Sequence, residues 1–119
     1  MARLTAPPPL HAPPGRKVRV AWTLSYVDER GKRRPFNGGY VFVRLLSASG
    51  GALSTAFAAE PRPGRYVARV TVPKGGIGGI QIGIRGTRCD QGGCAPSDLL
   101  FPITNDPFRA PRHAAAPPR

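Results

Sequence analysis

The sequence predicts an all-β protein, a β-sandwich of the Greek-key type, on three observations. The chain of 119 residues contains 15 glycines and 15 prolines, and both residue types disfavour helices. Several segments alternate apolar and polar residues with a period of two, which is typical of strands with one buried face. Turn residues separate these segments at short intervals, as in sandwiches of antiparallel strands. The length fits a single domain.

The first clear strand covers residues 17–27, KVRVAWTLSYV. Its apolar residues recur at every second position, so we expect one face of this strand to lie in the core. Residues 28–35 follow as a charged turn exposed to solvent. The residues predicted to face inward are Val18, Val20, Trp22, Leu24 and Tyr26.

Residues 40–46, YVFVRLL, are apolar on both faces apart from Arg44, which predicts a central strand. Residues 52–59 form a weaker strand of small side chains. Two further segments alternate clearly, and a last strand in residues 98–103 is interrupted by Pro102. The alternating apolar residues of the two clear segments are Tyr66, Ala68, Val70 and Val72 in one and Ile80, Ile82 and Ile84 in the other.

These strands place the sandwich in residues 17–105. Residues 1–16 are rich in proline and are expected to be extended or loosely attached, with RLTAP as a candidate edge strand. Residues 106–119 are rich in proline, alanine and arginine, and this composition predicts a disordered tail.

The formal net charge of +12 is compatible with a polyanionic partner. Arginine supplies most of the charge, and a codon bias toward arginine, alanine, glycine and proline is an alternative explanation of this excess. The arginines are scattered along the sequence rather than clustered. We therefore expect a solvated surface, with binding to polyanions that is non-specific.

The usual parts of catalytic and cofactor sites are missing from the sequence, so we predict no enzymatic activity, no cofactor and no metal. The glycine-rich residues 75–86 lack the third glycine of a dinucleotide loop and continue as a strand rather than a helix. His11 and His113 both lie in the proline-rich ends, where no rigid framework would hold a catalytic base.

The two cysteines, Cys89 and Cys94, are predicted to form a disulfide across a loop or hairpin. The intervening Asp-Gln-Gly-Gly signals a turn, whereas a redox pair prefers Cys-x-x-Cys at a helix N-terminus. A structural zinc site prefers four ligands. Free thiols in a cytosolic protein and a metal site are the alternatives. Closing so short a loop should contribute about 2 kcal/mol on the chain-entropy model.

Tyr40, Phe42 and Arg44 share one face of the central strand and form a candidate binding face, because exposed aromatic and basic residues together can bind nucleic acid. A core strand covered on both faces is the simpler interpretation. Trp22 and Tyr66 are predicted to be structural core residues. Their positions suggest an immunoglobulin-like sandwich, in which tryptophan fills the core and the tyrosine hydroxyl binds the preceding corner. The usual inter-sheet cysteine pair is absent.

The segments VRVAWTL, RPFNGGYVFVRLLSASGG, PGRYVARVTVPKGGIGGIQIGI and LLFPITNDPF resemble the YtkA-like and CopC-like group of bacterial extracytoplasmic immunoglobulin-like domains. The resemblance covers most of residues 3–108 as a pattern. It implies an exported, non-enzymatic sandwich. The histidine and methionine ligands of copper-binding members are not matched here, since the sole methionine is Met1.

We therefore expect a non-catalytic, extracytoplasmic binding or structural module with an unknown protein or cell-envelope partner. No apolar run is long enough to span a bilayer. No apolar signal segment follows Met1, so this expectation requires an export signal upstream of it. A basic nucleic-acid-binding β-domain in the cytosol is the alternative. A redox or metal protein that uses the two cysteines is the third hypothesis.

Overall fold

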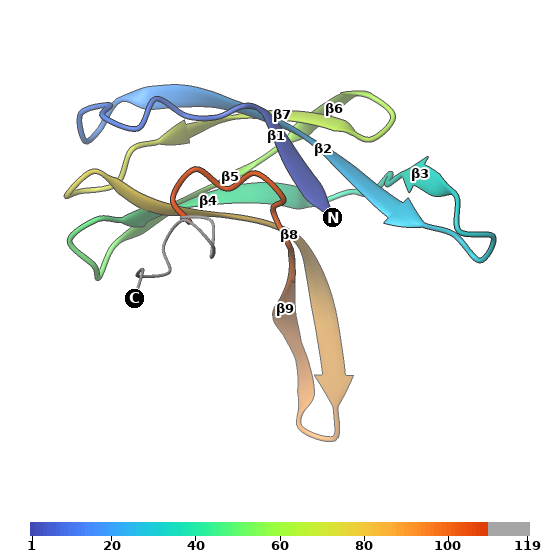
Figure 1. Cartoon of the computed structure of the whole chain (residues 1–119). Helices are drawn as coiled ribbons and strands as arrows, with labels where there is room; N and C mark the ends of the chain where they lie inside the picture. Colours follow the sequence, from blue (N-terminus) through green and yellow to red (C-terminus); the bar gives the residue numbers. More distant parts are fainter. Residues whose placement is uncertain (110–119) are drawn as a thin grey trace, which may run out of the picture.

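The computed structural model describes residues 1–109, which form two β-sheets packed face to face (Figure 1). One sheet has the strand order β1-β2-β7-β6, with β3 paired to the end of β2, and the other has the order β5-β4-β8-β9. The all-β sandwich predicted from the sequence is confirmed. The strands are β1 (Ala2–Ala6), β2 (Lys17–Val27), β3 (Arg33–Pro35), β4 (Val41–Ser47), β5 (Leu53–Phe57), β6 (Ala59–Arg62), β7 (Arg65–Thr71), β8 (Ile77–Asp90) and β9 (Gly93–Phe101).

The core lies between the two sheets and is built from alternate residues of each strand. Trp22 of β2 and Tyr66 of β7 are directly paired across the strands, and their rings are stacked with centroids 6.1 Å apart. Apolar burial of this kind is the main stabilising term of the fold. The buried core residues of the long strands are Val18, Val20, Trp22, Leu24, Val41, Val43, Leu45, Tyr66, Ala68, Val70, Ile77, Ile80 and Ile82.

Tyr26 departs from the predicted inward pattern of β2, because it is half exposed. The end of β2 extends past the sandwich and pairs with β3 to form a hairpin within the segment expected to be a charged turn. Asp28 holds this turn: its carboxylate accepts the backbone N–H groups of Arg30 and Lys32, each at 2.9 Å. The side chain of Arg34 pairs with the same carboxylate at 2.9 Å.

The N-terminal residues belong to the sandwich. Strand β1 pairs with β2, and Ala2 and Leu4 are 0% and 4% exposed in the core. Ile103 forms a parallel bridge with Ala2, which brings the two ends of the described chain together. The buried apolar area therefore begins at residue 2 rather than at residue 17. Of the predicted tail, residues 106–109 form turns and Phe108 packs against the core, while residues 110–119 lie outside the described part.

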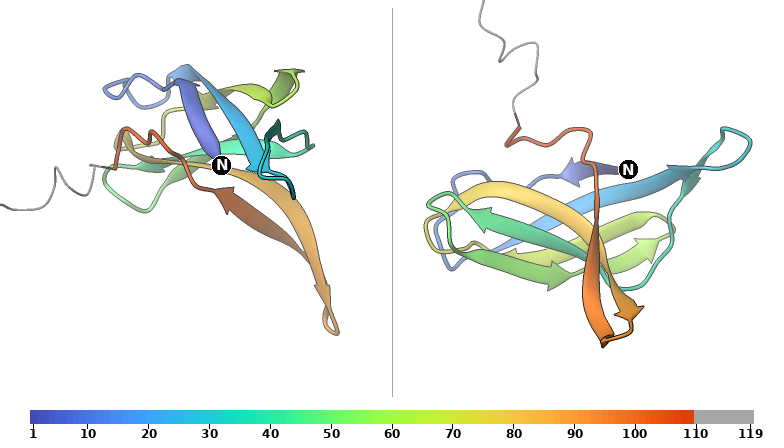
Figure 2. Two further views of the ribbon diagram at one scale, coloured as in Figure 1. Left: turned by 45° about the vertical axis from the view of Figure 1, so that its right-hand side comes forward. Right: turned by 90° about the horizontal axis from the view of Figure 1, so that it is seen from below.

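The β8–β9 hairpin continues far beyond the sandwich as a two-stranded arm (Figure 2). The strands stay in register from the Arg85–Asp98 pair to the Asp90–Gly93 pair, and every residue of this stretch is exposed. The segment expected to be a cysteine loop is thus the tip of a ribbon. A two-stranded hairpin without a core is marginally stable by itself.

Candidate binding surface at the base of the arm

The outer face of the β5-β4-β8-β9 sheet carries the predicted residues Phe42 and Arg44. Phe42 is fully buried although it points away from the core between the sheets. The Arg44 guanidinium lies 4.7 Å from the centre of the Phe42 ring, and Phe57 contacts the ring edge-on at 6.3 Å. The strand is therefore covered on both faces, but the outer cover is a layer of side chains rather than a second layer of backbone.

Gly83 makes room for the Phe42 ring. It lies directly opposite Phe42 on β8, and a Cβ at this position would stand 2.7 Å from the ring and 2.6 Å from the Leu99 carbonyl. Both separations are too short for a real side chain. The second glycine of the GIQIGI segment, Gly83, is thus required by close packing on the outer face of the sheet.

Asp98 joins two arginines on this face. Its carboxylate accepts hydrogen bonds from Arg44 at 2.7 Å and from Arg85 at 2.9 Å. The hydrogen bonds from Arg85 and then Arg44 hold the pKa of Asp98 down to about 2. The same contact with Asp98 raises the pKa of Arg85. The two guanidiniums are thereby oriented over the aromatic rings, and part of their charge is neutralised.

Tyr40 differs from its two predicted partners because its side chain projects into solvent and is 74% exposed. Its backbone has a φ of 60°, the left-handed region that residues other than glycine rarely adopt. In this conformation its carbonyl accepts the Arg85 backbone N–H at 3.0 Å. Its ring meets Phe57 edge-on, with centroids 6.4 Å apart. Strained, exposed residues of this kind concentrate at functional sites.

A groove of about 620 Å³ lies where the arm leaves the sheet, lined by Tyr40, Phe57, Arg85, Gly86 and Thr87. Its walls offer two aromatic rings, the hydroxyls of Tyr40 and Thr87, the guanidinium of Arg85 and the backbone of a glycine. Such a mixture of apolar surface and a few polar groups suits the binding of a partner side chain or a small ligand. The groove is continuous with the arm, since Arg85, Gly86 and Thr87 are consecutive residues of β8.

The predicted disulfide joins Cys89 and Cys94 near the tip of the arm. The two residues are directly paired across the hairpin, with their Cα atoms 4.0 Å apart. The arm has no buried side chains to hold its strands together, so this bond replaces the missing core as the clamp of the ribbon. It keeps the arm extended, and the extended arm forms one side of the groove.

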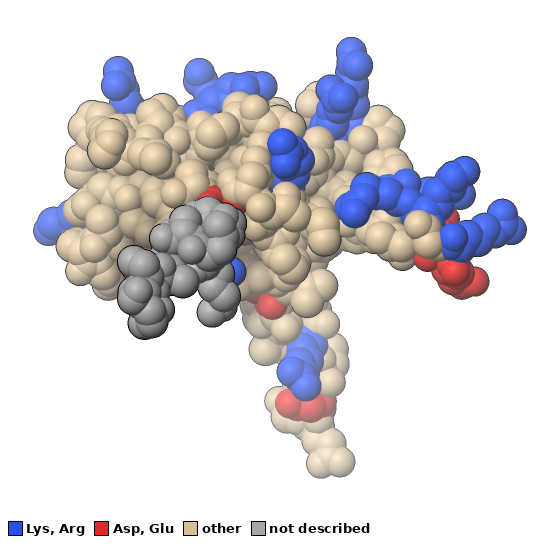
Figure 3. All heavy atoms as spheres, viewed as in Figure 1, with Lys and Arg blue, Asp and Glu red and all other residues tan. Residues whose placement is uncertain are grey.

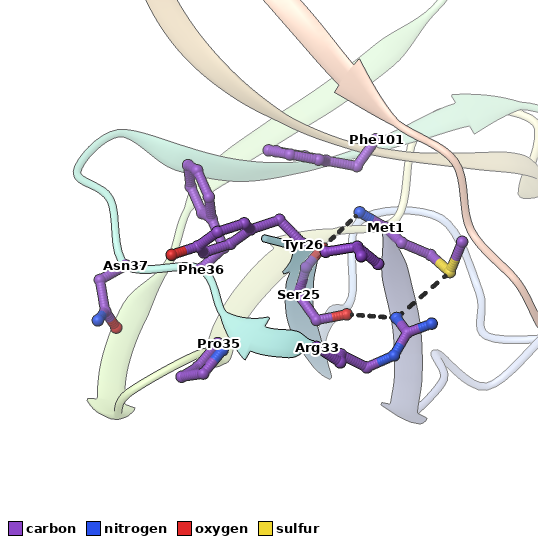
Figure 4. A pocket seen from close by; sticks show the side chains of 9 residues that line it. Met1, Ser25, Tyr26, Arg33, Pro35, Phe36, Asn37 and Phe101 are labelled. Atoms are coloured by element: carbon purple, nitrogen blue, oxygen red, sulfur yellow. Dashed lines mark hydrogen bonds between the residues drawn. The ribbon is translucent and has the colours of Figure 1, made fainter. Parts of the chain in front are cut away.

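A second cavity, of about 670 Å³, lies between the β2–β3 hairpin and Phe101 (Figure 4). Arg33, Ser25 and the Met1 amine, which line it, are bound to one another. Arg33 donates to the Ser25 hydroxyl at 2.9 Å, and the Met1 amine donates to the Ser25 carbonyl at 2.9 Å. Burial and the nearby Arg33 lower the pKa of this amine.

Within residues 1–109, no group of three or more histidine, cysteine, aspartate or glutamate side chains is arranged to hold a metal ion. His11 lies in an exposed loop between β1 and β2, and His113 lies outside the described residues. In the same part of the chain, no helix is long and apolar enough to cross a membrane.

The sequence reasoning identified three residues of this surface and missed Phe57, Arg85 and Asp98. The alternation of β8 places Arg85 on the same face as Gln81 and Gly83, so the sequence alone predicts the face of the sheet on which Arg85 lies. Its meeting with Asp98 depends on the register between β8 and β9, which the alternation within one strand does not give.

Comparisons with protein-family models, curated proteins and solved structures find no match for this chain.

Proposed function

We propose that this protein is a non-catalytic, extracytoplasmic binding module of the immunoglobulin-like type, and that it binds a partner protein at the base of the arm. The observation that carries the proposal is the groove beside Tyr40. A strained, exposed aromatic residue stands at its mouth, and a ribbon clamped by a disulfide forms its side. Rigid exposed aromatic residues are the commonest anchors of protein interfaces.

The strand order supports the immunoglobulin-like part of the proposal. In immunoglobulin sandwiches the strands A-B-E-D face a sheet that contains C, F and G. The orders β1-β2-β7-β6 and β5-β4-β8-β9 follow this arrangement when β3 is left aside. Trp22 and Tyr66 do not occupy the usual positions, because they lie on the equivalents of strands B and E. The Tyr66 hydroxyl binds Phe36 and Gly38 rather than the preceding corner.

The extracytoplasmic part of the proposal draws on the disulfide. Both cysteines are exposed, and an exposed disulfide persists mainly in oxidising compartments, since the cytosol keeps such thiols reduced. The similarity to YtkA-like and CopC-like domains points the same way. Expression of the chain with its natural upstream sequence, followed by treatment of whole cells with a membrane-impermeant thiol reagent after reduction, tests this location. Labelling only after the cells are broken would place the protein in the cytosol.

The alternative of a cytosolic nucleic-acid-binding domain gains little from the Tyr40–Phe42–Arg44 surface. Base stacking needs an open aromatic face, and Phe42 is buried beneath Arg44. The charges of Arg44 and Arg85 are partly neutralised by Asp98.

The binding site is tested by affinity capture from envelope fractions with the wild-type chain and a Tyr40→Ala/Phe57→Ser variant. We expect a protein retained by the wild type and lost by the variant, with purified partner and chain then giving the same difference in affinity. A Leu53→Ser variant, which changes an exposed residue on β5 away from the groove, is the matched control. Equal retention by all three proteins would refute the site.

A further inference from the structure

The opposite face of the molecule gathers basic side chains that are scattered in the sequence. On the outer face of the β1-β2-β7-β6 sheet, each strand contributes residues at positions that alternate with the core positions. We call this surface the arginine face. It consists of Arg3, Lys17, Arg19, Arg62, Arg65 and Arg69.

Figure 3 shows basic side chains standing out along the side of the molecule that this sheet forms, with no acidic side chain among them in that view. The arginines that are scattered along the sequence are therefore neighbours on one face of the folded chain. The physical reason is the antiparallel register, which places Arg19 directly opposite Arg69 and Arg62 directly opposite Arg65.

The charges of the arginine face are not compensated. In the described part of the chain the ion pairs involve only Arg34, Arg44 and Arg85, and all of these lie outside it. Glu60 of β6 is occupied as well, because its carboxylate accepts the Gly64 backbone N–H at 2.9 Å. Like charges directly opposite each other destabilise a sheet. The Arg19–Arg69 pair thus has a stability cost that the fold itself does not explain.

The arginine face also contains a hollow of about 320 Å³. Ala21 and Val67, which are paired across β2 and β7, form a floor of small side chains. Cationic side chains surround the floor, and threonine hydroxyls add neutral hydrogen-bonding groups. The polar residues that line the hollow are Thr5, Arg19, Thr23, Arg62 and Arg65.

We propose that the arginine face binds a linear anionic polysaccharide, with one acidic group of the polymer in the hollow. The cations extend along the strands: Arg65 and Arg69 are separated by four residues, or about 13 Å at the usual strand rise. An elongated polyanion can contact such a row at several points at once, whereas a small anion can occupy only the hollow.

The side chains of the arginine face also select among polyanions. None of its described outward residues on β1, β2 and β7 is aromatic, so the face offers no platform for nucleic-acid bases. Among the same described residues the large apolar side chains are the half-buried Val67 and the exposed Val27, which lies at the far end of β2 in the hairpin with β3, so no apolar cluster that would enter a membrane stands among the arginines. Arginines and hydroxyls fit sulfate or carboxylate groups and sugar hydroxyls.

The test compares two variants that lose the same charge. Arg19→Thr/Arg69→Thr removes the opposed pair, and Arg30→Gln/Lys32→Gln removes two exposed charges from the β2–β3 turn, where only the backbone of these residues is bound. Each variant lowers the formal charge of +12 by two. Heparin is the probe, and its affinity is measured by calorimetry over a series of salt concentrations with the full-length chain.

We expect the Arg19/Arg69 variant to lose roughly tenfold in heparin affinity at low salt, and the slope of log K against log salt to fall by about 1.4. The turn variant should lose less than threefold. Urea unfolding should show the Arg19/Arg69 variant to be at least as stable as the wild type, because the repulsion between the arginines is gone.

Equal losses in the two variants would overturn the proposal, since binding would then follow net charge rather than the arginine face. Tighter binding at equal salt to single-stranded DNA or to vesicles with anionic lipids than to heparin would overturn the choice of a polysaccharide. None of these outcomes depends on Tyr40 or the groove, so they are independent of the proposed protein partner.

Discussion

Removal of the Tyr66 hydroxyl should uncouple the loop before β4 from the core. This hydroxyl donates to the Phe36 carbonyl at 2.7 Å and accepts the Gly38 backbone N–H at 3.1 Å. A Tyr66→Phe variant leaves both backbone groups without their partner but keeps the ring stacked on Trp22. A net hydrogen bond contributes about 1 kcal/mol, and both groups are only partly buried, so we expect a loss of about 1–2 kcal/mol.

The same substitution has a signature in alkaline solution. Burial, with a smaller contribution from Glu60, raises the pKa of Tyr66 from 10.0 to about 12. The folded chain then keeps the proton that the unfolded chain releases. The stability of the wild type is therefore intact below pH 10 and falls as the pH rises from 10 toward 12. The phenylalanine variant lacks this titration.

Urea unfolding of both proteins, followed by tryptophan fluorescence, measures the effect. We expect a lower midpoint for the variant at pH 7 with an unchanged slope, and a difference between the proteins that shrinks above pH 10. Free energies of unfolding that agree within about 0.3 kcal/mol at pH 7, on the order of the measurement error, would refute the role of the hydroxyl.

Four further outcomes follow from the same contacts. The free energy of unfolding should be about 1 kcal/mol higher for Tyr40→Gly than for Tyr40→Ala, because only glycine relieves the left-handed backbone at φ 60°. The reverse order in urea unfolding would show that this backbone is not strained. Reduction of the Cys89–Cys94 bond should cost about 2 kcal/mol at most and abolish hydrogen-exchange protection in the arm alone, whereas loss of protection in β4 would assign the bond a role in the whole fold. Gly83→Ala should cost about 1–3 kcal/mol by overpacking against Phe42, and a neutral effect on the thermal midpoint would mean that the two strands separate easily. Asp98→Asn should be less stable than the wild type above pH 4, with the difference lost as the pH falls toward 2; a constant difference across this range would exclude the carboxylate charge as its cause.

The strands with one buried face were predictable because their alternation records that face directly. Residues 17–27 were predicted as a strand with the same bounds that β2 has in the structure. The arm was not predicted, because neither of its faces is buried. Between Gly86 and Asp90 both faces of β8 meet solvent, so no apolar residue is required at any position and no alternation arises.

The candidate site was only partly predictable because its contacts join strands that are distant in sequence. The Tyr40–Phe42–Arg44 pattern lies on the sheet that carries the candidate groove, but the alternation within β4 could not distinguish cover by a layer of side chains from cover by another layer of backbone. The arginine face was missed for the same reason. Arg19 and Arg69 are 50 positions apart in the chain and become neighbours only when the register of β2 and β7 is known.

The junction between β1 and residues 102–105 has a mechanical consequence. The Ala2 backbone N–H donates to the Pro102 carbonyl at 2.8 Å, and the Ala2 carbonyl accepts the Thr104 N–H at 2.9 Å. The side-chain amide of Asn105 accepts the Leu4 N–H through its oxygen at 2.8 Å and donates to the Leu4 carbonyl through its nitrogen at 2.9 Å. The two segments run parallel at this bridge. A force applied between residue 1 and residue 109 therefore pulls them past each other in shear, and the bonds must break together rather than one after another. The junction would act as a tension-bearing clasp that keeps the sandwich closed under load.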